Sequence, residues 1–353
     1  MASGVTSEPV VGWVELSGEN PALARAELAG ALGALDGKLR RGAGSGAPGA
    51  EYAEVELPEA SALRRLAERL ALARRVLRAF PETSESALAV RLRAEGASGR
   101  SAAFRPLSGA RSSLISPIAL RLAADYGAGG GSIDLDRPER RFWVGAIPGQ
   151  PVRAFEEIGT VNRAGFDARR MPRLPYQRPV SLAPRLGRVA ANLAGVRPGD
   201  AVVDPFVGTG ALLLEAALLG ARVSGVDRSP EMVRGALRNL RQFSIEPERI
   251  TVGDAGETFG PDPGEGWAAV LTDPPYGRAS GTAGEPPEQL ISRVLPSWAE
   301  KVRPGGSVVI VVPGGPDPLS APWVRKVSVP DRVHRSLTRE FRVYRRAGEI
   351  PTS

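Results

Sequence analysis

The chain has 353 residues, of which 42% are hydrophobic and 24% charged, and it carries a net charge of +7. This composition is typical of a soluble globular protein with two or three domains. The absence of cysteine excludes a disulfide framework and cysteine-ligated metal, and it is typical of a reducing cytoplasm. The chain has a single histidine and no apolar run long enough for a membrane span. We therefore expect a cytoplasmic protein with no metal site and no membrane segment.

The first third of the chain predicts mixed strands and helices. Residues 11–16 indicate a strand and residues 20–35 a helix, and the Gly/Ala/Pro stretch 41–50 indicates a loop. Residues 51–57 are typical of a strand. The arginine-rich stretch 59–79 predicts one helix, because Leu63, Leu66, Leu70 and Leu77 recur on one face.

The next elements continue this α+β pattern. Residues 87–96 alternate as in a strand, residues 116–127 predict a helix that a glycine ends, and residues 132–147 predict an acidic turn followed by a strand. Residues 151–180 hold six arginines and four prolines, so we expect a basic linker that lies on a surface.

From residue 181 the pattern changes to alternating strands and helices. Such alternation predicts a parallel sheet with helices on both faces. Ser229 and Pro230 are expected at the N-cap and first position of a helix. Residues 323–333 and 340–346 predict two antiparallel strands at the end. A doubly wound α/β sheet that ends in a β-hairpin is the architecture of a class I (Rossmann-like) methyltransferase domain.

Positive charge is unevenly distributed and is almost entirely arginine. One cluster lies within residues 64–78, a second spans residues 100–121 without an acid, and a third has eight basic residues between Arg325 and Arg346. A GC-rich genome would also favour arginine, but clusters of this kind are typical of a protein that binds a polyanion.

Three acids follow successive predicted strands of the second half. Asp204 opens the stretch "DPFVGTG", whose Gly208 and Gly210 let the backbone approach a ligand, and Asp227 ends the next strand. A dinucleotide site would need a third glycine, whereas an acid suits the ammonium group of S-adenosylmethionine. We expect Asp227 to accept the ribose hydroxyls and Asp254, with the backbone of Ala255, to bind the adenine. The predicted cofactor-binding residues are Asp204, Pro205, Phe206, Gly208, Gly210, Asp227, Asp254 and Ala255.

The stretch "DPPY" follows another predicted buried strand. The amino group of a nucleobase is a poor nucleophile, and acceptors aimed at its two hydrogens favour attack on a methyl group. Asp273 can supply one acceptor and take the proton, and the backbone carbonyl of Pro274 can supply the other. Pro275 holds that carbonyl outward, and Tyr276 offers a face for an unstacked base. This motif also serves adenine N6, cytosine N4 and glutamine amides.

The motifs DPPYGRAS, DPFVGTG and "QRPVSLAPRLGRVAANLAGV" resemble those of the archaeal tRNA guanosine-10 N2-methyltransferases. The N-terminal "ELSGENPALARAEL" and the C-terminal "VHRSLTREFRVYRR" look like the ends of that family. The resemblance implies a SAM-dependent enzyme that adds one or two methyl groups to the exocyclic amine of a tRNA guanosine. It differs from the family at Val207, which usually is cysteine and which we expect to have a packing role, and in the insertion at 41–50.

The resemblance also implies a domain order and an RNA-binding surface. Residues 1–50 would be an N-terminal α+β (ferredoxin-like) part and loop, 51–150 a THUMP RNA-binding domain, 151–180 the linker and 181–353 the methyltransferase domain. We expect a monomer whose arginines contact tRNA phosphates. The arginines expected at RNA are Arg64, Arg65, Arg105, Arg111, Arg278, Arg335 and Arg339.

Three other functions are compatible with the sequence. The first is a THUMP methyltransferase for another tRNA or rRNA guanosine. The second is a DNA adenine-N6 methyltransferase, which would carry a target-recognition domain in place of the THUMP-like region. The third is a non-catalytic RNA-binding protein, which the intact DPPY and cofactor acids disfavour.

Overall fold

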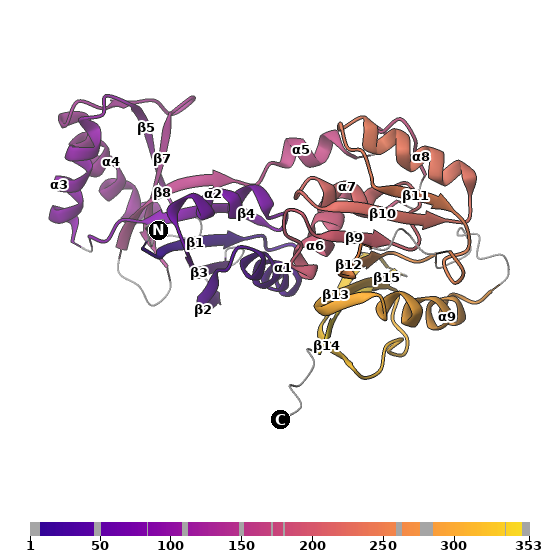
Figure 1. The fold of residues 1–353 in the computed structure, drawn as a ribbon. Helices are drawn as coiled ribbons and strands as arrows, with labels where there is room; N and C mark the ends of the chain where they lie inside the picture. Colours follow the sequence, from indigo (N-terminus) through magenta and orange to yellow (C-terminus); the bar gives the residue numbers. More distant parts are fainter. Residues whose placement is uncertain are drawn as a thin grey trace, which may run out of the picture. The chain divides into compact units, whose positions relative to one another are not determined.

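The computed structural model describes residues 8–45, 51–82, 84–107, 112–147, 152–170, 172–178, 181–258, 263–275, 285–335 and 337–347. The chain divides into two compact units (Figure 1). Unit 1 comprises residues 1–25, 35–68 and 72–161, and unit 2 comprises residues 26–34, 69–71 and 162–353. None of the described helices is long and apolar enough to span a membrane.

Unit 1 is built on one eight-stranded sheet with the strand order β2-β3-β1-β4-β8-β7-β5-β6. The elements of this part of the chain are β1 (Val10–Leu16), α1 (Pro21–Ala34), β2 (Lys38–Ser45), β3 (Glu51–Leu57), α2 (Ala60–Arg69), β4 (Ala73–Ala79), α3 (Glu85–Gly96), β5 (Ser101–Pro106), α4 (Ser112–Ala128), β6 (Ser132–Ile133), β7 (Arg140–Ala146) and β8 (Val152–Thr160). The first four strands are antiparallel and follow the β-α-β-β-α-β order of ferredoxin-like folds. Pairing of β4 with β8 continues the same sheet into the second half of the unit.

The predictions for two segments of unit 1 need correction, because their hydrophobic residues were assigned to the wrong period. Residues 87–96, predicted as a strand, lie in helix α3, where the buried residues Leu88, Leu92 and Gly96 are four apart and Ser84 caps the N-terminus. The helix predicted over 59–79 ends at Arg69. Residues 73–79 instead form β4, in which Val76 and Leu77 are buried between two neighbouring strands.

The predicted boundaries around unit 1 also need correction. A boundary between residues 50 and 51 would separate β3 from its partner strands β2 and β1. Residues 38–45 are part of the sheet rather than loop, and 46–50 lie outside the described residues. Residues 152–160, predicted as linker, form β8, which pairs with both β4 and β7 because Ala154 and Phe155 are buried core residues.

Unit 2 has a seven-stranded sheet with the order β11-β10-β9-β12-β13-β15-β14. Its elements are α5 (Arg163–Ala168), α6 (Pro184–Ala194), β9 (Ala201–Asp204), α7 (Ala211–Ala217), β10 (Arg222–Asp227), α8 (Pro230–Arg241), β11 (Arg249–Val252), β12 (Trp267–Thr272), α9 (Pro287–Ala299), β13 (Val302–Val312), β14 (Trp323–His334) and β15 (Leu337–Arg346). Strands β9 to β13 are parallel, and β15 and β14 form the antiparallel end that the sequence predicted.

Burial explains why unit 2 adopts a parallel sheet. Every residue of β9 and β12 is buried, as expected when helices cover both faces of the sheet. The largest core side chains here are Trp267 and Trp298, which belong to one cluster with the apolar face of α9. The predicted cap of α8 is confirmed, since the Ser229 hydroxyl accepts a hydrogen bond from the Met232 backbone and Pro230 begins the helix.

Residues 163–170, which were also predicted as linker, are attached within unit 2 through a buried carboxylate. Glu215 on α7 is fully buried. Its two carboxylate oxygens accept hydrogen bonds from Arg169 Nε (2.5 Å) and Nη2 (3.1 Å). Arg188 on α6 lies 3.0 Å from the same carboxylate, and the Phe166 ring lies against both guanidinium groups. Glu215 therefore has a structural role, because it attaches residues 163–170 and α6 to α7.

Removing this carboxylate should destabilise unit 2. We expect Glu215→Ala to lower the free energy of unfolding by about 3–5 kcal/mol, because two arginines would lose their buried counter-charge. Urea denaturation followed by far-UV circular dichroism measures the change. Glu246→Ala, which removes an exposed partner of Arg241, is the matched control and should cost less than about 1 kcal/mol. Equal losses in the two variants would contradict a supporting role for Glu215.

Candidate active site

The candidate site lies at the carboxyl edge of the unit 2 sheet, where the strand order reverses. From β9 the chain proceeds to β10 and β11 on one side, and then returns to β12 on the other side of β9. Ligands of open α/β sheets bind in the crevice at such a switch point. Asp204 ends β9 and Asp273 follows β12, so the fold brings these two predicted residues to adjacent strand ends.

Asp204 is a buried carboxylic acid at the end of β9. One oxygen, Oδ1, accepts a hydrogen bond from the Phe206 backbone at 2.9 Å. Burial raises the pKa of Asp204 to about 8, and the nearby carboxylates of Asp273 and Asp227 act in the same direction. A positively charged ligand group would reverse this effect, so the environment of Asp204 favours a bound cation.

The glycine loop between β9 and α7 has the conformation that its sequence predicts. Gly208 and Gly210 have φ angles of 51° and 83°, which side chains other than glycine rarely adopt. The Gly208 backbone N–H donates to Asp227 Oδ2 at 2.9 Å. Val207 is buried and its backbone N–H donates to Val226, so the packing role expected for this residue is confirmed.

Asp227 is positioned as predicted at the end of β10, and its two oxygens accept backbone hydrogens. Oδ2 accepts a hydrogen bond from the Gly208 backbone N–H and Oδ1 accepts one from the Ser229 backbone N–H, both at 2.9 Å. Burial raises the pKa of Asp227, although these two hydrogen bonds act in the opposite direction. A carboxylate offers about four acceptor positions, so Asp227 has capacity for ligand hydroxyls as well.

Asp254 follows β11, and arginines lie beside it. Its Oδ1 accepts the Gly256 backbone N–H at 2.7 Å and Arg293 Nη1 at 3.1 Å, and Oδ2 lies 3.4 Å from Arg228 Nε. Partial burial acts to raise the pKa of Asp254, but the hydrogen bonds from Arg293 and Gly256 hold it below its ordinary value. The backbone oxygen of Ala255 accepts the indole N–H of Trp298 at 2.7 Å.

The proline corner after β12 is only partly described. Thr272 and Pro274 are buried, and Asp273 and Pro275 are half-buried. The predicted residues Tyr276 and Arg278 lie outside the described residues. The part that is described places the Asp273 carboxyl group close enough to Asp204 to influence its ionisation.

The sequence analysis did not identify the residues that support the glycine loop through contacts with Thr209. The Ser181 and Thr209 hydroxyls are 2.9 Å apart, and Asn239 on α8 donates to the Thr209 carbonyl at 2.9 Å. Asn239 also exchanges two hydrogen bonds with the backbone of Tyr176. A cavity of about 200 Å³ adjoins this loop and is lined in part by Ser181, Thr209 and Arg170. Because these contacts join distant segments, only the polar character of Asn239 on an amphipathic helix could have indicated one of them.

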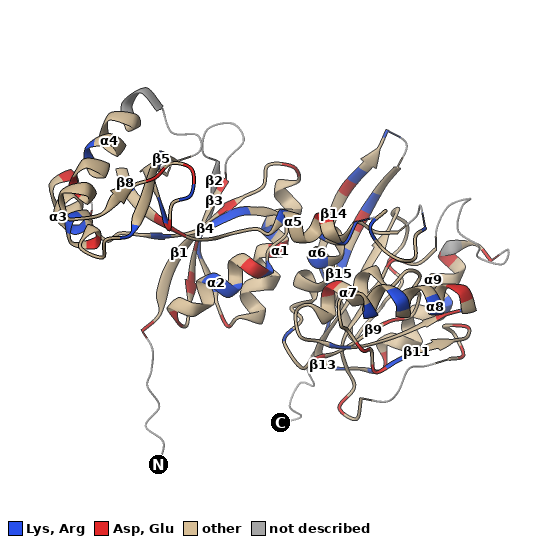
Figure 2. Cartoon of the chain, turned by 90° about the horizontal axis from the view of Figure 1, so that it is seen from above, with Lys and Arg blue, Asp and Glu red and all other residues tan. Residues whose placement is uncertain are grey.

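The arginines predicted to contact RNA differ in their surroundings. Arg64 and Arg335 are exposed, and Arg105 is exposed while donating to the Leu135 carbonyl. Arg65 pairs with Glu59 at 2.7 Å and Arg339 with Asp331 at 3.0 Å. Arg111 lies outside the described residues, as does Arg278. Figure 2 shows basic positions along β14 and β15.

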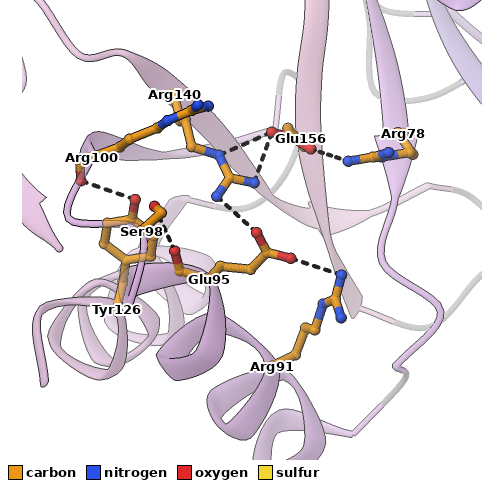
Figure 3. A network of polar contacts seen from close by, with 8 residues as sticks. All are labelled: Arg78, Arg91, Glu95, Ser98, Arg100, Tyr126, Arg140 and Glu156. Atoms are coloured by element: carbon orange, nitrogen blue, oxygen red, sulfur yellow. Dashed lines mark hydrogen bonds and ion pairs between the residues drawn. The ribbon is translucent and has the colours of Figure 1, made fainter. Parts of the chain in front are cut away.

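Many other arginines of unit 1 are neutralised by neighbouring acids. Arg140 bridges Glu95 and Glu156, each at 2.8 Å, while Arg91 pairs with Glu95 and Arg78 with Glu156 (Figure 3). This network connects α3 to β7, β8 and β4. A cluster of arginines in the sequence therefore does not by itself identify a surface that is available to a polyanion.

Comparison with known proteins identifies similar sequences for the half of the chain that carries this site. Residues 172–328 match the family model described as RMKL-like, methyltransferase domain. The chain is 35% identical over 193 residues to a tRNA (guanine(10)-N2)-dimethyltransferase of Methanothermobacter thermautotrophicus, covering 54% of this chain and 56% of that protein. It is 34% identical over 206 residues to the protein of the same name from Pyrococcus abyssi, covering 57% and 58%. The chain thus spans about half the length of the curated relatives that it matches.

A solved structure with a similar fold covers nearly the whole chain. TrmN from Thermus thermophilus aligns with a TM-score of 0.50 and 21% identity over 95% of this chain and 99% of that chain. The predicted fold class is confirmed by this likeness and by the family match. The second half of the chain therefore has the class I (Rossmann-like) methyltransferase fold, and residues 172–328 within it match the RMKL-like methyltransferase family model.

Proposed function

We propose that this protein is an S-adenosylmethionine-dependent tRNA (guanine-N2)-methyltransferase that acts on the guanosine at position 10, adding one or two methyl groups. The observation that carries the proposal is the placement of Asp204 and Asp273 at adjacent strand ends within a methyltransferase domain. The names of the archaeal relatives support the choice of tRNA and of guanine N2.

The residues at the sheet edge fit S-adenosylmethionine. The buried Asp204 suits the ammonium of its methionine part, the loop from Pro205 to Gly210 suits close backbone approach, and Asp227 can accept ribose hydroxyls. Asp254 and Ala255 would receive the adenine. When bound, this cofactor supplies an electrophilic methyl group on a sulfonium.

The catalytic role falls to the corner after β12. Asp273 accepts one hydrogen of the guanine amino group and takes its proton as the nitrogen becomes positively charged. The backbone carbonyl of Pro274 accepts the second hydrogen, and Tyr276 stacks on the base after it leaves its helix. These acceptors make the nitrogen lone pair more available for the new N–C bond.

Arginines supply most of the affinity for tRNA. We place a THUMP-type RNA-binding domain in the second half of unit 1, with its end at β8 rather than at residue 150. Arg64 and Arg105 in unit 1 and Arg335 in unit 2 would contact phosphates, which gives affinity without base identity. We further propose a monomer that works in the cytoplasm.

The first test is a product analysis with the purified protein. Labelled methyl donor and unmodified tRNA should give label in N2-methylated guanosine at position 10. Asp273→Ala should lower kcat by a factor on the order of 100 or more, because the proton acceptor is lost. Binding of S-adenosylhomocysteine and far-UV circular dichroism verify that the variant is folded. Label in N6-methyladenosine, or full turnover by Asp273→Ala, would refute the proposal.

A second test uses the ionisation of Asp204. In the folded protein Asp204 keeps a proton up to a pKa of about 8, whereas the unfolded chain loses it near pH 4. The unliganded protein should therefore lose stability relative to Asp204→Asn as the pH rises from about 4 to about 8. Between pH 6 and 9 the difference in unfolding free energy should change by at least about 1.4 kcal/mol, the equivalent of one pKa unit.

Urea denaturation of both proteins at several pH values measures this difference. Saturating S-adenosylhomocysteine should reduce the effect, because its ammonium group would stabilise the ionised carboxylate. A difference that does not vary with pH would contradict the buried, protonated state of Asp204.

A third test concerns the hairpin of β14 and β15. Arg335→Ala should weaken tRNA binding and reduce the slope of log K against log salt by about 1, as expected for one lost phosphate contact. Arg339→Ala is the matched control and should change the slope less, because Asp331 already pairs with its guanidinium. Titrations of fluorescent tRNA at several salt concentrations give both slopes. An unchanged slope for Arg335→Ala would show that Arg335 does not contact a tRNA phosphate.

A further inference from the structure

The side chain of Arg293 connects helix α9 to the carboxylate that we assign to the cofactor adenine. We propose that Arg293 is a positioning residue that orients the carboxylate of Asp254, so that the site selects adenine over its deaminated form, hypoxanthine. This inference rests on the proposed function, because it requires Asp254 to bind the cofactor base.

The geometry around Asp254 leaves its two oxygens in different environments. Arg293 Nη1 and the Gly256 backbone N–H both donate to Oδ1, at 3.1 and 2.7 Å. The other oxygen, Oδ2, lies 3.4 Å from Arg228 Nε. Two donors on Oδ1 fix the rotation of the carboxyl group and direct Oδ2 as the acceptor for a ligand.

Arg293 is itself held in place at two points. Its Nε and Nη2 donate to the two oxygens of Glu285 at 3.1 and 2.9 Å, the fork geometry that arginine forms with a carboxylate. Helix α9 is anchored beside the same segment, because Trp298 is fully buried and donates to the Ala255 carbonyl at 2.7 Å. These contacts favour the position of the guanidinium beside Asp254.

An ionised carboxylate offers acceptors only. It can receive the amino hydrogens of adenine, but it repels the carbonyl oxygen that hypoxanthine carries at the same ring position. A site that is built around one donor group discriminates strongly against an analogue without it. The direction of the Asp254 carboxylate, which Arg293 helps to fix, thus determines which base is accepted.

Arg293 contributes little to the stability of the fold. Its side chain is 42% exposed, and exposed ion pairs have small effects on unfolding free energies. Variants at this position should therefore fold, which leaves ligand affinity as the informative measurement.

Gly256 provides an independent way to break the same contact. A Cβ at this position would lie 2.1 Å from Arg293 Nη1 and 3.0 Å from Asp254 Oδ1. Arg293 would have to move, and its flexible side chain can do so at low cost. Gly256→Ala should therefore reproduce the effect of Arg293→Met while both charged residues remain.

The experiment measures binding of S-adenosylhomocysteine and S-inosylhomocysteine by calorimetry. The wild-type protein should prefer the adenine compound by more than about tenfold, the effect of one charge-assisted hydrogen bond. Arg293→Met and Gly256→Ala should both weaken S-adenosylhomocysteine binding by about fivefold to tenfold and narrow this preference. Arg293→Lys should restore only part of it, because an ammonium group cannot form the two-point fork. In turnover assays KM for the methyl donor should rise more than kcat falls.

Two controls separate the possible outcomes. Arg241→Met, on an exposed arginine of α8, should bind both compounds like the wild type. Asp254→Ala should lose the preference for adenine altogether. If it does so while Arg293→Met and Gly256→Ala behave like the wild type, Arg293 is only a surface ion pair and the inference is refuted. If Asp254→Ala keeps the wild-type preference, the adenine role proposed for Asp254 fails, and this inference fails with it.

Discussion

Burial of the Asp204 carboxyl group is the constraint on which the site depends. A carboxylate away from water is unfavourable unless hydrogen bonds or an opposite charge compensate it. The Phe206 backbone supplies one such bond, but burial still raises the pKa of Asp204 to about 8. A positively charged ligand group would compensate the buried carboxylate, so this burial favours a cationic ligand.

The surroundings of this carboxyl group are held by polar contacts between segments that are distant in sequence. Glu215 connects α7 to Arg169 and Arg188, and Asn239 connects α8 to Thr209 and to Tyr176. The Asn239 contact supports the glycine loop at Thr209, and the Glu215 contacts hold helix α7, which follows the loop. The loop itself has left-handed glycine conformations and a hydrogen bond to Asp227.

The arginine-rich composition has two different consequences. In unit 1, Arg78, Arg91 and Arg140 pair with Glu95 and Glu156 and contribute to the fold. Others, such as Arg64 and Arg335, are exposed and could face a polyanion. Charge clustering in a sequence cannot separate the two groups, because the acids that pair with an arginine can lie far away in the chain. The two acids that pair with Arg140 are 16 and 45 residues away from it.

The sequence alone determined the α/β architecture of the second half, the glycine loop, and the three strand-end acids, because these follow from local patterns of burial, turn chemistry and spacing. It did not determine the period of residues 87–96 or the end of the helix at Arg69, since alternating and helical patterns coincide over such short stretches. Only the tertiary structure assigned residues 152–160 to a sheet, joined Arg169 to Glu215, and brought Arg293 to Asp254. These features depend on contacts between residues far apart in the chain, and no local pattern encodes which distant partner a side chain will meet.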